Sequence, residues 1–128
     1  MTHPWTRVAA LLGLLGVGLG AFGAHSLKDI ASPEQLEWWR TASLYQLLHA
    51  APLLALDRLG GRGPVRLAGL ALTGGVLIFS GSLYAMGLGA PRWLGAITPV
   101  GGLALMVGWA ALLYACTAGA AEARQNSE

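Results

Sequence analysis

Four long stretches without a charged residue dominate this sequence and restrict what it can fold into. They are Val8–Leu27, Thr41–Leu56, Leu67–Pro91 and Trp93–Ala121. An apolar stretch of about 18 residues or more is typical of a helix that crosses a bilayer. Only 11% of the residues are charged and 55% are hydrophobic, whereas a soluble domain has about 25% charged residues. The pattern therefore predicts an integral membrane protein and excludes soluble enzymes and nucleic-acid-binding domains.

The predicted fold is all-α, a single membrane domain over residues 1–128 with four transmembrane helices. Ser32-Pro33-Glu34-Gln35 has the pattern of a capping box and predicts a helix start ahead of the second span. Thr98-Pro99 predicts a similar capped start for the fourth helix. We place the spans at residues 5–25, 36–57, 65–89 and 98–118.

The distribution of basic residues predicts that both termini are cytoplasmic. With four spans, the termini and the loop after the second span share one side. That side carries Arg7, Arg58, Arg62, Arg66 and Arg124. The opposite side carries Lys28, Arg40 and Arg92, offset by Asp29, Glu34 and Glu37. Because cytoplasmic loops are enriched in Lys and Arg, we assign the richer side to the cytoplasm. The first apolar stretch is too long for a typical signal peptide, so we expect it to stay as a helix.

Small residues predict where helices approach closely. Gly16, Gly20 and Ala24 lie four residues apart on the first span, a spacing that allows close helix contact. Gly81 on the third span is expected to leave room for a neighbouring helix. We expect these positions to support packing or self-association.

Polar residues inside the spans are the candidate functional residues, because a bilayer offers them no water. By counting residues from the predicted ends, we place most of them in the outer half of the membrane. We expect Tyr45 and His49, four apart on one helix, to face Ser80 and Tyr84 on the next and exchange hydrogen bonds. Either these side chains only join helices, or they line a pocket for a small ligand, a proton or a lipid headgroup. The candidate pocket residues are His25, Tyr45, Gln46, His49, Ser80, Ser82, Tyr84 and Thr98.

The sequence offers little support for catalysis or for a bound cofactor. The acidic residues nearest the spans are expected at the membrane interfaces, so no carboxylate is placed to orient a histidine base inside the membrane; they are Asp29, Glu34, Glu37 and Asp57. A metal site needs three or four converging ligands, and only His25 and His49 are near the membrane. We therefore predict no catalytic residues, no metal and no cofactor. A subunit of a redox complex that contacts quinone or haem is a further alternative.

Four separate motifs together resemble a known family. They are AFGAH at 21–25, WRTASLYQLLHA at 39–50, FSGSLY at 79–84 and LGAITPVGG at 94–102. In this order they resemble the "domain of unknown function 423" family, whose animal relatives are called transmembrane protein 256-like. The resemblance implies a small protein of the bacterial inner membrane with four spans. It implies no particular activity.

These observations favour a non-enzymatic membrane protein that acts through self-association or through association with a membrane complex. The alternative is transport or binding of a small ligand, a proton or a lipid in the outer polar pocket. Beyond the lipid bilayer and a homo-oligomeric or membrane-protein partner, we expect no partner, and specifically no nucleic acid.

Overall fold

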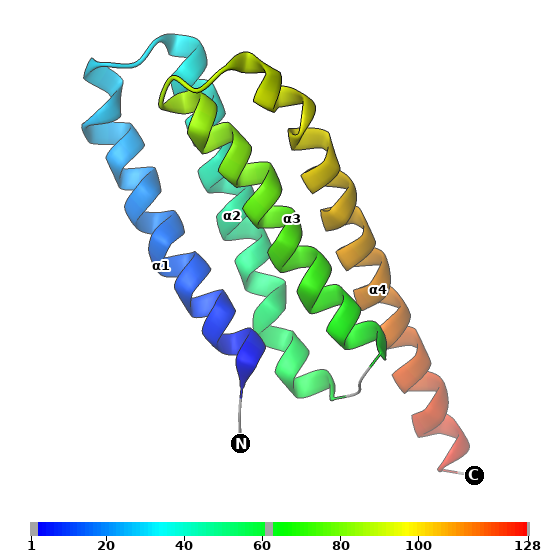
Figure 1. The fold of residues 1–128 in the computed structure, drawn as a ribbon. Helices are drawn as coiled ribbons and strands as arrows, with labels where there is room; N and C mark the ends of the chain where they lie inside the picture. Colours follow the sequence, from blue (N-terminus) through cyan, green and yellow to red (C-terminus); the bar gives the residue numbers. More distant parts are fainter. Residues whose placement is uncertain (1–2, 61–62, 128) are drawn as a thin grey trace.

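The chain forms four long helices that run alternately up and down, as a computed structural model shows (Figure 1). The structure describes residues 3–60 and 63–127. The all-α prediction is confirmed for these residues. The elements are α1 (Pro4–His25), η1 (Leu27–Asp29), α2 (Pro33–Leu59), α3 (Gly63–Gly87), η2 (Arg92–Ala96) and α4 (Thr98–Gln125).

Each long helix packs mainly against its neighbours in the sequence. The extensive contacts are α1 with α2, α2 with α3, and α3 with α4, and no other pair of long helices packs extensively within the described residues. Figure 1 shows α1 and α4 on opposite sides of the molecule, and both termini at one end. The bundle is therefore an open row of helices, in which α2 and α3 are central and α1 and α4 form the edges.

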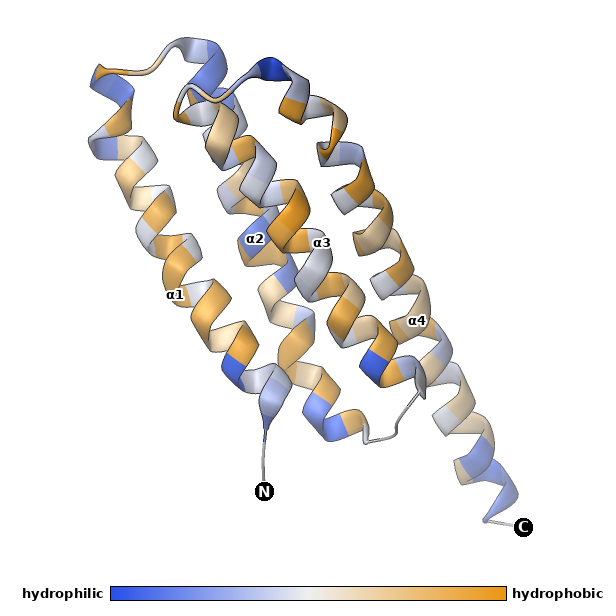
Figure 2. Ribbon diagram, in the orientation of Figure 1, coloured by the Kyte–Doolittle hydropathy of each residue, from blue (hydrophilic) through white to orange (hydrophobic). Residues whose placement is uncertain are grey.

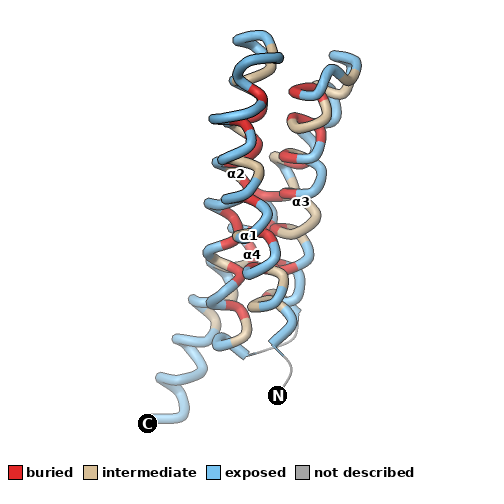
Figure 3. Tube along the Cα trace, turned by 90° about the vertical axis from the view of Figure 1, so that its left-hand side faces the viewer, coloured by how far each residue is buried: buried red, intermediate tan, exposed pale blue. Residues whose placement is uncertain are grey.

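The apolar core runs along the row and includes buried residues from all four helices, and Figure 3 shows buried positions on the inward sides of the helices. Leu53, Leu72 and Val76 are almost completely buried. Many other large apolar side chains point outward, as expected for a protein whose surroundings are lipid. The last turns of α4 are exposed on all sides (Figure 3).

Three of the four helices are long and apolar enough to cross a membrane: α1 with η1, α3, and α4 with η2. The helix α2 does not meet that criterion, because its ends and its middle carry polar residues. Figure 2 shows hydrophilic residues at both ends of the molecule and a hydrophilic segment midway along α2. Arg62, one of the basic residues used to predict topology, lies outside the described residues.

One predicted helix cap is confirmed and one is wrong. Ser32 and Gln35 form a reciprocal capping box at the start of α2, with bonds of 3.2 Å and 2.8 Å. By contrast, α4 begins at Thr98 itself, and no side chain caps it. The Thr98 hydroxyl lies 2.7 Å from the Ser82 hydroxyl on α3 instead. It joins two helices rather than capping its own.

The small residues predicted on α1 pack inside the chain, to different extents. A Cβ at Gly16 would lie 2.7 Å from the Leu47 side chain of α2, so this glycine permits close packing as predicted. Gly20 makes a looser contact with Ser43, and Ala24 is exposed. This face therefore contacts α2 at Gly16 and Gly20, and Ala24 makes no comparable contact.

The prediction for Gly81 is wrong, because this residue is exposed and a Cβ there would meet nothing within 4 Å. Other glycines permit the closest contacts. A Cβ would lie 2.3 Å from the Trp39 ring at Gly23, 2.9 Å from the backbone of Leu105 at Gly75, and 2.4 Å from the backbone of Phe79 at Gly101. Spacing along one helix could not identify them, because the neighbouring helix decides which face is crowded.

Candidate functional site

Two hydrogen bonds from α2 to the backbone of α1 set the relative height of these helices. The Trp39 indole N–H donates to the Leu19 carbonyl at 2.7 Å, and the Gln46 amide donates to the Leu12 carbonyl at 2.8 Å. The two donors are seven residues apart on α2, and the two acceptors are seven apart on α1. The helices thus stay in register over two turns.

This register shows how the polar residues of α2 lie relative to α1. If the pairing of α1 with α2 is continued along both helices, Arg40 lies level with Gly18, and Arg7 lies level with Ala51. Gln46 lies midway between these two charged levels. Gln46 is therefore central between the two charged levels, and the predicted position of Gln46 and Tyr45 in the outer half of the membrane stays a prediction.

The two arginine levels are about 16 Å apart at 1.5 Å per residue, less than the roughly 30 Å of a hydrocarbon core. Helical side chains lean toward the N-terminus of their own helix. Arg7 and Arg40 are exposed and belong to antiparallel helices, so their side chains lean away from the centre in opposite directions. Long arginine side chains can then place their charges at the two interfaces.

A closed polar network joins α1, α2 and α3 near this centre. The Tyr84 hydroxyl of α3 lies 2.8 Å from Gln46 Oε1 and 3.2 Å from Ser43 Oγ. Ser43 also donates to the Trp39 carbonyl on its own helix. Ser80 Oγ donates to the Ala42 carbonyl at 2.8 Å. The predicted hydrogen bonds between the second and third helices therefore exist, but through Ala42, Ser43 and Gln46.

In this closed network the polar atoms bond to one another or to backbone carbonyls. Gln46 is 4% exposed and Ser80 is 2% exposed. Gln46 uses its amide group on α1 and its carbonyl oxygen on α3, so one side chain links three helices. In the part of the chain that the structure describes, Thr73 Oγ1 is the single fully buried side-chain polar atom without a partner. The closed network is thus organised for helix packing.

Tyr45 and His49 point to a different face, toward α3 and α4. The predicted contact of this pair with Ser80 and Tyr84 is wrong, because those residues bond to the other polar face of α2. The Tyr45 ring stacks on Phe79 at 4.3 Å between centroids and on His49 at 5.7 Å. His49 also meets the edge of Trp109 of α4 at 6.0 Å. A column of aromatic rings therefore lies between α2, α3 and α4.

This aromatic column lines a groove of about 510 Å³ that is open on one side. Its walls come from α2, α3 and α4. The lining residues are Tyr45, His49, Phe79, Pro99, Gly102, Leu103, Leu105, Met106 and Trp109. Gly101 lets α4 approach the backbone of Phe79, one of the lining residues. We call this feature the lateral groove.

The remaining predicted residues lie away from both features. Ser82 and Thr98 pair with each other at the junction of α3 and α4, near the η2 end. His25 is exposed at the end of α1. The eight predicted residues thus form a closed network, a groove, a separate pair and an isolated histidine, not one pocket.

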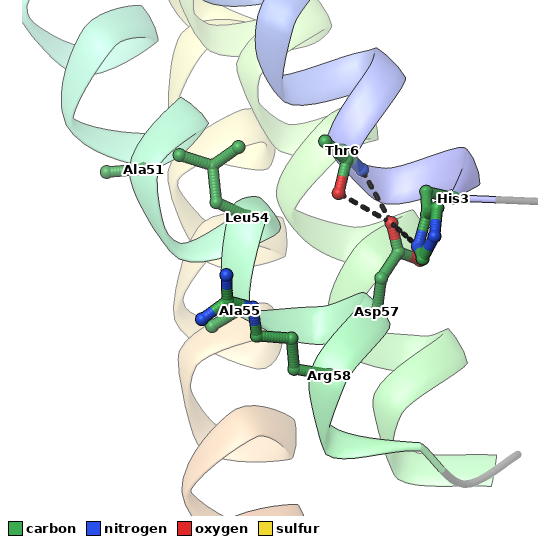
Figure 4. Close-up of a pocket in the computed structure, with 7 residues that line it drawn as sticks. All are labelled: His3, Thr6, Ala51, Leu54, Ala55, Asp57 and Arg58. Carbon is green, nitrogen blue, oxygen red and sulfur yellow. Dashed lines mark hydrogen bonds and ion pairs between the residues drawn. The ribbon is translucent and has the colours of Figure 1, made fainter.

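A further polar cluster at the opposite end of the bundle was not predicted. Asp57 of α2 accepts from the backbone N–H and the hydroxyl of Thr6, each at 2.8 Å, and His3 lies 4.0 Å away (Figure 4). The helix α1 starts with Pro4 and has no side-chain cap from His3. Asp57 therefore caps α1 from another helix, where a negative charge suits the helix dipole. No local pattern in the sequence indicates this cap, because Asp57 and Thr6 are fifty-one residues apart.

Comparison with known proteins decides the family. The family described as "Protein of unknown function (DUF423)" matches residues 19–102. A UPF0382 membrane protein of Staphylococcus epidermidis is 41% identical over 110 residues, covering 84% of this chain and 90% of the relative. The chain belongs to this family.

Other members extend the family's range. The UPF0382 membrane protein YwdK of Bacillus subtilis is 40% identical over 112 residues, covering 84% of this chain and 91% of YwdK. A UPF0382 membrane protein of Schizosaccharomyces pombe is 41% identical over 113 residues, covering 84% of this chain and 96% of the relative. The DUF423 chain is thus a multi-pass membrane protein with bacterial and yeast relatives. No solved structure matches it significantly.

The segment of this DUF423 protein that matches the family contains the side chains of the closed network and two of the three walls of the lateral groove. Residues 19–102 include the side chains of the closed network and the α2 and α3 walls of the lateral groove. Trp109, which completes the α4 wall, lies beyond the matched segment.

Proposed function

We propose that this protein is a non-enzymatic, four-span protein that acts by associating with itself or with a larger membrane complex. The observation that carries the proposal is the open row of helices. The edge helix α1 packs extensively only on α2. Its outward face therefore has no partner helix within the described residues.

The outward face of α1 suits contact with another membrane helix. Leu14 is 73% exposed and Val17 is 64% exposed, and a Cβ at Gly18 would meet nothing within 4 Å. Glycine beside large apolar residues permits close helix packing in lipid. We propose that this face, and not the inward face with Gly16, makes the contact.

The proposal of a non-enzymatic role is supported by where the acidic residues lie. Asp29 and Glu34 are at one end of the bundle, and Asp57 and Glu122 are at the other. Asp57 caps α1. The closed network in the middle bonds to itself and to backbone, which supports a structural role for its hydroxyl and amide groups.

We further propose that α2 is a fourth span and that both termini face the cytoplasm of a bacterial inner membrane. The helix α2 packs between α1 and α3 along its length, so it lies at the same depth as two candidate spans. Arg7, Arg58, Arg66 and Arg124 lie at the end that carries the termini, and basic residues favour the cytoplasmic side. Labelling of single cysteines at Ser127 and Ile30, in a Cys116→Ser background, tests the topology. Labelling of Ser127→Cys by an impermeant reagent in intact cells contradicts it.

Native mass spectrometry of gently extracted protein tests the association. We expect a homo-oligomer or a complex with another membrane protein. The variant Gly18→Leu should dissociate it without unfolding the chain, because open space surrounds that position. Gly119→Leu, also in open space but near the end of α4, is the matched control. A monomer in the native membrane extract, with no companion protein, would refute the proposal.

One observation favours a second function, the binding of a small ligand. The lateral groove, not the predicted outer pocket, contains polar groups that lack partners among the described residues. The hydrogen-bonding groups and aromatic rings of the lateral groove indicate a particular class of ligand.

A further inference from the structure

His49 presents an unused hydrogen-bond acceptor to the lateral groove. Its Nδ1 lies 2.7 Å from the Tyr45 carbonyl, which can only accept, so Nδ1 carries the proton of that bond. In the neutral imidazole, Nε2 is then an acceptor. Nε2 has no hydrogen-bond partner among the described residues, although His49 is only 8% exposed. A polar atom in such surroundings is costly unless something bonds to it.

The position of the lateral groove determines how a ligand could reach it. His49 is on the turn after Gln46, inside the band between the Arg7 and Arg40 levels. The groove is lined by α2 and by α4, two helices whose described residues make no extensive contact with each other, and two of its α4 side chains, Leu103 and Met106, are apolar and exposed. A ligand therefore enters from the hydrocarbon part of the bilayer. It must be uncharged, because the groove offers no ion-pair partner among its described lining residues.

The walls of the lateral groove favour a flat ring over a flexible chain. Tyr45 and Phe79 stack at 4.3 Å, and Trp109 stands edge-on to His49 at 6.0 Å. Aromatic rings pack well against further rings in stacked or edge-on arrangements. An acyl chain has no hydrogen to donate to Nε2, and a phospholipid headgroup is charged and stays at the interface. The Tyr45 hydroxyl likewise has no partner among the described residues, so it is available for a second polar atom of the ligand.

We propose that the lateral groove binds a neutral, lipid-soluble hydroxyaromatic ring of the quinol type, whose hydroxyl donates to His49 Nε2. Tyr45, Phe79 and Trp109 hold the ring, and the lipid-soluble tail leaves through the open side. This is a binding site, independent of the association proposed for the outward face of α1.

Binding to the intact protein in lipid nanodiscs tests the site. The probe is decylubiquinol, and decylubiquinone is its control because it has no hydroxyl to donate. Isothermal titration should show saturable binding of the quinol, with the quinone about tenfold weaker, the difference expected for one lost hydrogen bond. Equal binding of both forms overturns the role of His49, and partition into empty nanodiscs alone overturns the site.

Matched histidine variants connect the binding to the lateral groove. His49→Phe keeps a ring of similar size but removes the acceptor, so quinol affinity should fall about tenfold, to the level of the quinone. His25→Phe changes an exposed histidine outside the groove and should bind like the wild type. Unchanged quinol affinity in His49→Phe refutes the proposal.

A second variant, in a residue that lines the lateral groove, tests the site even if His49→Phe does not fold. Trp109 is 45% exposed, so Trp109→Leu should fold normally while weakening both quinol and quinone. Photo-crosslinking in native membranes, from a photoreactive residue in place of Met106, then identifies the molecule that occupies the lateral groove. A crosslink to a quinol-type molecule supports the site, whereas a crosslink only to another protein helix shows that the groove is a protein interface and overturns it.

Discussion

The two polar faces of α2 differ in how completely their hydrogen bonds are made. Toward α1 and α3, Gln46 and Ser43 are part of a closed network that includes Tyr84. Toward α4, His49 Nε2 and the Tyr45 hydroxyl have no partner among the described residues, and a groove lies beside them. Residues one to three positions apart on one helix thus have different roles. The difference shows that polarity inside a membrane indicates a site only where bonding remains incomplete.

The largest expected effect comes from the close contact between α3 and α4 at Gly101 and Phe79. Gly101→Ala places a Cβ 2.4 Å from the Phe79 backbone, which cannot move aside without separating α3 from α4. We expect a loss of about 3 kcal/mol in unfolding free energy, measured by SDS titration. Gly102→Ala is the control, since its Cβ would lie 3.8 Å from the Phe79 ring and should change stability by about 0.5 kcal/mol at most. Equal effects at both positions would contradict the packing described.

A comparison of Gln46 with His49 tests the two faces directly. Gln46→Leu removes the bond to the Leu12 carbonyl and leaves Tyr84 without its shorter bond. We expect a loss of about 2 kcal/mol, because buried polar atoms are left without partners. His49→Phe removes only a bond within its own helix and should cost less than half as much. If His49→Phe proves the more destabilising variant, the assignment of the two faces is reversed.

Tyr84 and Tyr45 allow the same comparison of the two polar faces of α2, with only a hydroxyl group removed in each variant. Tyr84→Phe loses the bonds to Gln46 and Ser43 and should cost about 1 kcal/mol in unfolding free energy. Tyr45→Phe loses a hydroxyl that bonds to no described residue and should leave stability nearly unchanged. SDS titrations of both variants, in parallel with the wild type, measure the difference. Similar losses would mean that the Tyr45 hydroxyl has a structural partner.

The smallest expected effect lies at the junction of α3 and α4. Ser82→Ala removes the 2.7 Å bond to Thr98 and should cost about 0.5 kcal/mol. Thr117→Ala, which removes a bond within exposed α4 only, is the control and should have no measurable effect. Thermal unfolding followed by circular dichroism distinguishes the two. If Ser82→Ala lowers the unfolding free energy as much as Gln46→Leu does, the pair of Ser82 and Thr98 stabilises the fold as strongly as the closed network.

The fold was largely predictable because charge and hydropathy report directly on the membrane. The four uncharged runs match the four helices, and the capping box at Ser32 and Gln35 is correct because it depends only on neighbouring residues. The hydrogen-bond partners of the candidate residues were not predictable, because the neighbouring helix decides which polar groups meet: Ser80 bonds to the Ala42 carbonyl, and Tyr84 bonds to Gln46 and Ser43. The role of Asp57 was missed because the helix that it caps is fifty-one residues away.

The sequence by itself determined that this is a membrane protein, where along the chain its four long helices lie, and which few polar side chains must find partners inside it. Only the tertiary structure decided which partners they find. A helical period places Ser43, Tyr45, Gln46 and His49 on one helix but does not say which neighbour each of them meets. That depends on register and on close approach at glycines such as Gly16 and Gly101, which arise from several helices packing at once. For that reason the closed network and the lateral groove could be distinguished only in three dimensions.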